Sequence, residues 1–308
     1  MIVENEVQLT DSVIHEMRNT QDARGREVLE SMVRHLHNFA REVRLTEKEF
    51  DIGLRAIAKM GQMTNASHNE VRLMAGSLGL SMLICLINNA ETGTADTSAN
   101  LLGPFWRANP PVTPNGGSIV RSETGGVPMF FTGTVVDSSG NPVAGAEVDV
   151  WQTSPVGLYE NQDANQADWN LRGKFITDEN GVFAYRSIKP TGYPIPTDGP
   201  VGDFLRFQNR SPFRPAHLHA LIYKPGFKTI ASELYTADDP AIDTDTQFGV
   251  TRPLMVEYTE HNDEPAPAPD VTGTWYSLDH RFVLEPGEAF LPVPPISGKA
   301  TKEPATAA

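Results

Sequence analysis

Two histidines one residue apart are the feature of this chain whose type and spacing most directly suggest metal binding. His217 and His219 end the sequence Arg-Pro-Ala-His-Leu-His, which begins at Arg214. Residues 216–223 read as a strand, and side chains alternate along a strand, so both imidazoles project from one face. Imidazole binds iron, zinc and copper alike. The pair can therefore reach one metal ion, although two hydrogen-bonded histidines without a metal fit the same pattern.

Two histidines rarely complete a metal site, so further ligands are needed. The chain has one cysteine, Cys85, and no His-Glu-x-x-His sequence. Five of its seven tyrosines lie in or beside expected strands, where aromatic side chains usually pack. Tyr159 and Tyr193 differ because they lie in loop-like settings, Gly-Leu-Tyr-Glu-Asn-Gln-Asp and Gly-Tyr-Pro-Ile-Pro. Spacing alone does not assign a metal to either tyrosine.

The first hundred residues have the periodicity of helices. Apolar residues follow helical spacing through 23–43. Capping-box patterns at Thr46–Glu49 and Ser67–Glu70 predict two further helix starts, the second opening a long run that ends near Asn89. Residues 71–87 are apolar on more than one face. We expect them to be buried, against the rest of the chain or against a second copy of it.

Beyond about residue 100 the pattern changes to short strands between glycine- and proline-rich turns. Asp178–Gly181 is a hairpin signal between two of them. Many short strands of this kind predict an antiparallel β-sandwich. The expected fold is α+β, with a helical region at 1–100, a β-sandwich at 101–295 and a flexible tail at 296–308. The expected strands are 129–137, 146–152, 174–177, 182–186, 216–223, 228–235, 254–258 and 281–284.

Composition excludes several classes of partner. The net charge of −14 opposes binding to phosphate backbones and anionic membranes, so we expect no nucleic acid partner. A single cysteine permits no internal disulfide, which favours a reducing compartment. The N-terminus has no signal-peptide pattern, and no apolar stretch approaches the ~20 residues that cross a bilayer. The sequence therefore predicts a soluble, cytoplasmic protein without a membrane partner.

Seven short motifs, in order, resemble those of the intradiol ring-cleavage dioxygenases, and the resemblance extends from the helical region to about residue 260. In that family the iron ligands are the tyrosine before the Glu-Asn-Gln-Asp turn, the tyrosine of Gly-Tyr, and both histidines of His-x-His. The resemblance implies one non-haem Fe(III) per chain, bound by Tyr159, Tyr193, His217 and His219. The matching segments are 102–105, 133–137, 148–152, 159–163, 171–173, 192–200 and 214–219.

This ligand set suits ferric iron. A phenol has a pKa near ~10, but a coordinated cation can displace its proton. Fe(III) favours anionic oxygen, and two tyrosinates with two neutral histidines leave a net charge near +1. Four protein ligands also leave positions open for a substrate.

The resemblance further implies how the reaction proceeds. A diol binds through both hydroxyls, Tyr193 is displaced and accepts a substrate proton, and dioxygen attacks the ring to yield a muconate. Arg214 lies where the family places an arginine that can stabilise negative charge on the ring; a surface salt bridge is the alternative. Glu233 replaces a glutamine common in the family, and could orient water or pair with Arg214.

The resemblance also suggests the substrate and the assembly. The motifs fit best the subgroup that cleaves hydroxyquinol, a small aromatic triol, with O₂ to 3-hydroxy-cis,cis-muconate and maleylacetate. The alternative is catechol or a substituted catechol, giving cis,cis-muconate, and a more distant one is a sandwich that binds ligand without chemistry. The family implies a homodimer through the N-terminal helices, with a phospholipid between them in some members. The expected ring-binding residues are Met82, Cys85, Leu101, Leu102, Gly103, Pro104 and Arg214.

Overall fold

The computed structural model describes residues 2–90 and 97–300, which form two compact units. The first unit is Met1–Ala58 and the second is Lys59–Ala308. The expected boundary lay near residue 100. The helices that follow residue 59 instead group with the sheets, because they pack on the loops that surround the site described below.

The first unit contains helices α1 (Glu6–Glu16) and α2 (Ala23–Glu42), with a short 3₁₀ turn between them, and most of α3 (Glu47–Met63). The helix predicted at 23–43 is confirmed by α2. The capping box at Thr46 is also confirmed: the Thr46 N–H donates to Glu49 Oε2 at 2.9 Å, and the Glu49 N–H donates to Thr46 Oγ1 at 3.3 Å.

The long helix predicted from Ser67 to Asn89 is wrong, because the structure has two helices there, α4 (Glu70–Ser77) and α5 (Leu80–Asn89). Gly79 separates them with a left-handed φ of 73°, and their axes bend by 74°. The cap of α4 is Asn69, whose side chain accepts from the Arg72 N–H at 2.9 Å. Ser67 lies two residues before this cap, and its N–H and hydroxyl both donate to Asn65 Oδ1.

No single helix among residues 2–90 and 97–300 is long and apolar enough to cross a membrane. Helices α4 and α5 meet the length and composition criteria only when taken together across their bend.

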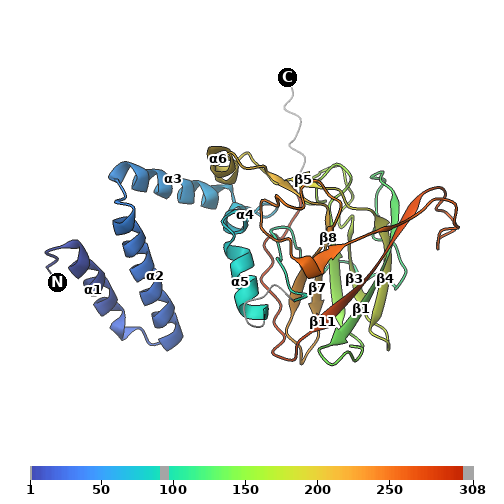
Figure 1. Ribbon diagram of the computed structural model, residues 1–308, viewed down its shortest axis with the longest axis horizontal. Helices are drawn as coiled ribbons and strands as arrows, with labels where there is room; N and C mark the ends of the chain where they lie inside the picture. The colour runs from blue at the N-terminus through green and yellow to red at the C-terminus, as the bar shows by residue number, and fades with distance from the viewer. Residues whose placement is uncertain (1, 91–96, 301–308) are drawn as a thin grey trace, which may run out of the picture. The chain divides into compact units, whose positions relative to one another are not determined.

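Two mixed β-sheets form the body of the second unit (Figure 1). One has the order β10-β11-β1-β4 and the other β3-β2-β7-β8-β9, while β5 and β6 pair separately. The bounds are β1 Pro128–Asp137, β2 Glu147–Trp151, β3 Arg172–Ile176, β4 Val182–Ile188, β5 Tyr193–Pro194, β6 Phe213–Arg214, β7 His217–Tyr223, β8 Ile230–Thr236, β9 Met255–Val256, β10 Thr259–His261 and β11 Trp275–Leu284.

The purely antiparallel arrangement predicted from the sequence is wrong, because β1 pairs with β11 in parallel and so does β8 with β9. A short hairpin forces antiparallel pairing, whereas strands joined by a long connection are free of that constraint. β11 follows β1 only after nine intervening strands, and Tyr276 pairs with Met129. The expected strand at 281–284 is the end of β11.

Side chains from both large sheets meet in one apolar core. The ring centroid of Phe131 in β1 lies 5.0 Å from that of Tyr185 in β4, and the centroid of Phe175 in β3 lies 5.3 Å from that of Tyr185. Leu218, Ala220 and Ile222 of β7 point into this core. The alternate residues of β7 therefore face the opposite side of the five-stranded sheet, where a second cluster contains Trp151, Tyr159 and Tyr193.

The expected tail begins within the ordered part of the second unit. Ile296 is buried, the Ser297 N–H donates to Ala66 O at 2.8 Å, and the Ala300 N–H donates to Asn161 O at 2.8 Å. Residues 301–308 lie outside the described residues.

Gly133→Ala tests the packing of the core. A methyl group at Gly133, in the middle of β1, would overlap the ring of Phe183. We expect the free energy of unfolding in urea to fall by ~1–3 kcal/mol. Gly61→Ala in α3 is the control, because nothing lies within 4 Å of the added methyl group. It should leave stability unchanged or raise it by up to ~1 kcal/mol. Equal effects of the two variants would contradict this packing.

Candidate metal centre

The four tyrosine and histidine residues expected to bind metal come from three places in the fold. His217 and His219 lie on the same face of β7, and His219 pairs with Trp151 of β2. Tyr193 lies on β5, paired with Arg214 of β6. Tyr159 lies in the loop that follows β2, where its N–H donates to Gln162 Oε1 at 3.1 Å. The pairing of β2 with β7 fixes where this loop begins relative to the two histidines.

The structure brings the polar ends of these four side chains together in the interior. The Tyr159 hydroxyl lies 3.1 Å from the Tyr193 hydroxyl, 2.8 Å from His219 Nε2 and 3.4 Å from His217 Nε2. The Tyr193 hydroxyl lies 3.5 Å from His217 Nε2. None of the four residues is more than 3% exposed. Two phenol oxygens and two imidazole nitrogens thus surround one point without access to bulk water.

The histidines turn their Nε2 atoms toward the phenols, and His217 Nε2 also lies 3.3 Å from Arg214 Nη1. His217 Nδ1 lies 2.7 Å from Pro215 O, so the neutral ring donates there and its Nε2 lone pair faces the phenols. The ring of His219 stacks on Trp151 at 4.6 Å between centroids, with 9° between the planes. Burial lowers the pKa of both histidines, helped by Arg214 for His217 and by His217 for His219. Both therefore stay neutral, as metal ligands must be.

The two phenols are protonated unless a cation is present. Burial raises the pKa of Tyr193 to about 12, and burial together with Tyr193 raises the pKa of Tyr159 well above its ordinary value. A hard trivalent cation supplies what this environment lacks, because it displaces the phenol protons and neutralises the resulting charge. The donor set therefore fits Fe(III), with Tyr159, Tyr193, His217 and His219 as the residues that can hold it.

A second possible metal group consists of His217, His219 and Glu233, whose ligand atoms lie within 4.8 Å of one another. Two histidines and a carboxylate are the ligand type of ferrous oxygenases. However, Glu233 faces Nδ1 of His219, at 3.4 Å, on the far side of the ring from Tyr159. Its oxygens are also occupied by Arg214 and Tyr235. The group with the two tyrosines is therefore the better site.

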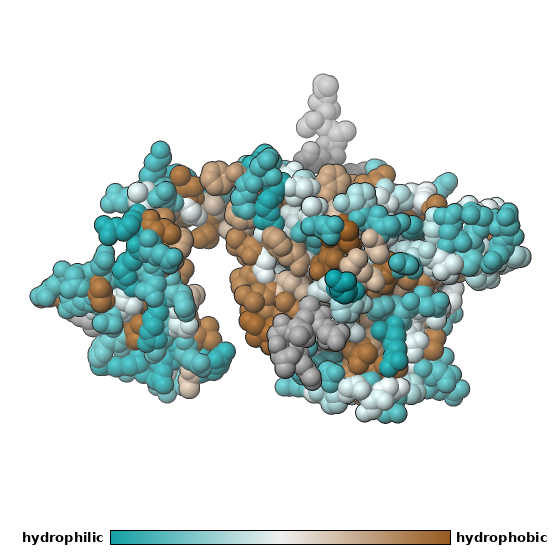
Figure 2. Space-filling model, in the orientation of Figure 1, coloured by the Kyte–Doolittle hydropathy of each residue, from teal (hydrophilic) through white to brown (hydrophobic). Residues whose placement is uncertain are grey.

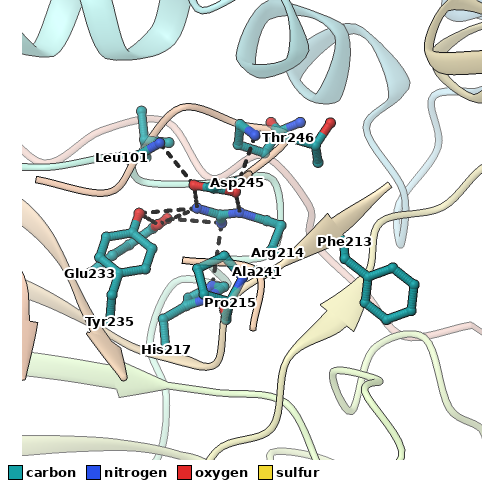
Figure 3. Close-up of polar contacts among 12 residues, drawn as sticks. Leu101, Phe213, Arg214, Pro215, His217, Glu233, Tyr235, Ala241, Asp245 and Thr246 are labelled. Atoms are coloured by element: carbon teal, nitrogen blue, oxygen red, sulfur yellow. Dashed lines mark hydrogen bonds and ion pairs between the residues drawn. The ribbon is translucent and has the colours of Figure 1, made fainter. Parts of the chain in front are cut away.

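Arg214 is held between two buried carboxylates (Figure 3). Its Nη2 lies 2.6 Å from Glu233 Oε2, and its Nε lies 2.9 Å from Asp245 Oδ1. Although burial opposes it, these two acids keep the pKa of Arg214 well above its ordinary value. Burial alone would raise the pKa of Glu233, but Arg214 and His217 lower it below its usual range. Arg214 and Glu233 are therefore both charged.

Glu233 pairs with Arg214, one of the two roles considered from the sequence. Sequence reasoning missed Asp245, which lies in Thr-Asp-Thr-Gln, because an isolated acidic residue in a loop gives no local signal. It also assigned Tyr235 to packing. The Tyr235 hydroxyl in fact donates to Glu233 Oε2 and lies 3.1 Å from Arg214 Nη2.

A cavity of about 740 Å³ lies beside the four converging side chains. Tyr193 and Arg214 line it, whereas Tyr159 and both histidines do not. Apolar side chains of α5 gather on the surface next to the opening (Figure 2), among them Leu80 and Ile84. Of the expected ring-binding residues, Met82 is buried away from the cavity. The others line it: Cys85, Leu101, Leu102, Gly103, Pro104 and Arg214.

Comparisons with known proteins identify the class. The family model described as "Dioxygenase" matches residues 102–285, and the model "Catechol dioxygenase N terminus" matches residues 22–96. The chain belongs to the intradiol ring-cleavage dioxygenases. Within that family it is most like the hydroxyquinol 1,2-dioxygenases.

Three relatives define this similarity. The hydroxyquinol 1,2-dioxygenase of Rhizobium sp. (strain MTP-10005) is 39% identical over 89% of this chain and 93% of its own length. The catechol 1,2-dioxygenase of Candida albicans is 36% identical over 89% of this chain and 91% of its own. The crystal structure of hydroxyquinol 1,2-dioxygenase from Pseudomonas putida DLL-E4 superposes with a TM-score of 0.80 at 37% identity, covering 92% of this chain and 99% of that one.

Arg214→Gln tests the buried charge cluster in the iron-free protein. The substitution leaves Glu233 and Asp245 buried without their cation, so we expect the free energy of unfolding to fall by ~3–5 kcal/mol. Arg206→Gln is the control, because Arg206 pairs with Asp203 at the surface and its loss should change stability by less than ~0.5 kcal/mol. Chemical denaturation at pH 7 measures both. A loss below 1 kcal/mol for Arg214→Gln would contradict the assignment of charges.

Proposed function

We propose that this chain cleaves hydroxyquinol between adjacent hydroxyl-bearing carbons, using dioxygen and one Fe(III) bound by Tyr159, Tyr193, His217 and His219. The observation that carries the proposal is the convergence of two phenol oxygens and two imidazole nitrogens, within 3.5 Å contacts, in a buried site beside a cavity. When bound, the iron supplies a Lewis acid that activates the diol toward dioxygen.

Tyr193 is the residue placed to exchange protons with a substrate. Its side chain lines the cavity, whereas Tyr159 lies behind it. Tyr193 also sits on a two-residue strand, so little regular structure fixes it. A diol that enters the cavity meets the Tyr193 oxygen first, and that oxygen takes a hydroxyl proton as the diol binds.

Arg214 and the Gly103–Pro104 segment orient the ring. Gly103 has a left-handed φ of 66°, and a methyl group there would lie 3.3 Å from the His219 ring. Glycine thus keeps the space above the site open. The guanidinium of Arg214 lies on the cavity wall, fixed by Glu233 and Asp245, and stabilises negative charge that develops on the ring. By pairing with Arg214, Glu233 has a positioning role.

The charges of the site balance. Fe(III) with two phenolates carries +1, and Arg214 with Glu233 and Asp245 carries −1. A buried site of zero net charge avoids most of the cost of placing ions in a low-dielectric interior. Glutamine in place of Glu233 would leave one positive charge without compensation.

Hydroxyquinol is the favoured substrate because the similar proteins described above include hydroxyquinol 1,2-dioxygenases from two sources. Catechol remains the alternative, since catechol 1,2-dioxygenase is also among the relatives. The ring meets Cys85, Leu101 and Leu102 on the cavity wall.

The assembly proposed is a homodimer through the N-terminal helices, with a two-sheet sandwich as the catalytic part of each subunit. Supporting the dimer, α2 exposes a row of apolar side chains that is unusual for a surface helix. A phospholipid between the subunits and a cytoplasmic location complete the proposal. The exposed residues are Val28, Leu29, Met32, Leu36 and Phe39.

Oxygen uptake by the iron-loaded protein distinguishes the substrates. With hydroxyquinol and catechol supplied separately, we expect kcat/KM to be at least tenfold higher for hydroxyquinol, with 3-hydroxy-cis,cis-muconate as the product. The reverse preference, with cis,cis-muconate as the product, would assign the chain to catechol cleavage. No uptake with either, from protein that holds iron, would favour a ligand-binding protein without chemistry.

Tyr159→Phe and Tyr193→Phe test the ligand set. Bound to Fe(III), the wild-type protein should show a visible tyrosinate-to-iron charge-transfer band, and each variant should lose part of it. Oxygen uptake should fall by at least 10²-fold in both. Tyr223→Phe is the control, because Tyr223 ends β7 away from the cluster and should leave band and uptake unchanged. A colourless iron-loaded wild type would contradict ligation by tyrosine.

A further inference from the structure

We infer that Arg172, paired with Glu160, is a positioning residue that holds Tyr159 in place from the side away from the cavity. This inference rests on the proposed function. It concerns a buried ion cluster on the side of Tyr159 away from the cavity, composed of Arg107, Glu160 and Arg172.

The cluster is buried and shares one carboxylate oxygen. Glu160 Oε1 lies 2.7 Å from Arg107 Nη1 and 2.7 Å from Arg172 Nε. Glu160 and Arg172 are at most 2% exposed, while Arg107 continues outward to Asp168 at 2.8 Å. Breaking a buried ion pair leaves an uncompensated charge, so each member restricts the movement of the others. Glu160 directly follows Tyr159 in the sequence and transmits this restriction to its backbone.

Arg172 connects every segment around the Tyr159 ring. It lies in β3, its Nη1 donates to Phe105 O at 2.7 Å, and its Nη2 donates to Asn161 Oδ1 at 2.8 Å. Phe105 packs on the Tyr159 ring at 4.7 Å between centroids. One guanidinium therefore holds Glu160 and Asn161, the two residues after Tyr159, together with the segment that packs against the ring. A planar group with five donors can do this, and an ammonium group cannot.

Arg172 also places a positive charge beside Tyr159. Its guanidinium carbon lies 6.0 Å from the centre of the Tyr159 ring. Buried arginines near aromatic rings attract the electron-rich face, and more strongly when the phenol carries negative charge. This contact adds to the hydrogen bonds of Arg172 that hold the surroundings of the Tyr159 ring in place.

Tyr193 is positioned by different contacts. It lies on the two-residue strand β5, which pairs only with the two-residue strand β6. The charged group near it is Arg214, which Glu233 and Asp245 hold and which lines the cavity. Tyr159 is therefore held by an ion cluster on the side away from the cavity, whereas Tyr193 lines the cavity.

The experiment compares Arg172→Gln, Arg172→Lys and the double variant Arg172→Gln/Glu160→Gln in the full chain loaded with Fe(III). The double variant removes both buried charges together, so it avoids the isolated Glu160 that could prevent folding of Arg172→Gln. Arg186→Gln is the matched control, because Arg186 pairs with Asp270 at the surface. The measurements are iron release to a chelator, resonance Raman bands of tyrosinate with and without substrate, and kcat and KM.

For wild type, we expect one tyrosinate signature to persist after substrate binds. In Arg172→Gln and in the double variant, that persistent signature should weaken or split, iron should be released 10–100-fold more readily, and kcat should fall more than KM changes. Arg172→Lys should restore part of the iron retention but not the single signature. Arg186→Gln should match wild type.

The inference is overturned if the folded variants keep the wild-type Raman bands and iron retention and lose only thermal stability, because that is a purely structural role. It is likewise overturned if Arg172→Lys matches wild type in every measurement, because the planar guanidinium with its several donors is then not needed. Failure of the proposed function is a separate result: wild-type protein itself would then show no tyrosinate bands with Fe(III).

Discussion

The burial of four polar ligand atoms around one point is the constraint on which the rest of this structure depends. Removing phenol and imidazole groups from water costs free energy unless they find partners, and here the inward-facing atoms contact one another and Arg214. Burial raises the pKa of both phenols and lowers that of both imidazoles, so without a cation the four groups are uncharged. A bound trivalent cation resolves this arrangement, because it takes two anionic and two neutral donors at once.

Pairing of strands explains how residues so distant in sequence meet. The alternation of β7 directs His217 and His219 away from the main core, and the register of β2 sets Trp151 against His219. Tyr159 lies in the loop after β2, and Tyr193 lies on the two-residue strand β5. Charged clusters stand behind the ligands: Arg214 with its two acids on the cavity side, and Arg172 with Glu160 behind Tyr159. The two histidines thus lie on a strand paired on both sides, whereas Tyr193 lies on the two-residue strand β5.

Local sequence patterns predicted the elements whose form depends on residues close together in the sequence. The helical spacing at 23–43 gave α2, and the alternation at 216–223 gave β7 with both histidines on one face. The parallel partner of β1 was not predictable in this way, because Met129 and Tyr276 are far apart in sequence. The break at Gly79 was missed because apolar residues continue on both sides of it, although a glycine with positive φ ends the helix.

Some residues of the site could be predicted from the sequence and others could not. The His-x-His spacing follows from strand geometry, whereas Tyr159 and Tyr193 were nominated by family resemblance, since nothing in their loops indicates a metal. Asp245 lies outside the matching motifs, and although Glu160 and Arg172 lie within two of them, nothing in the sequence indicates that they pair. Their importance arises from burial and pairing, which only the folded chain reveals.

The most direct test of the central claim is anomalous diffraction at the iron edge from crystals of the Fe(III)-loaded protein. The account predicts one strong peak per chain, bonded to the hydroxyl oxygens of Tyr159 and Tyr193 and to Nε2 of His217 and His219. A peak bonded to Glu233 with the histidines, or no ordered iron in this cluster, would contradict it.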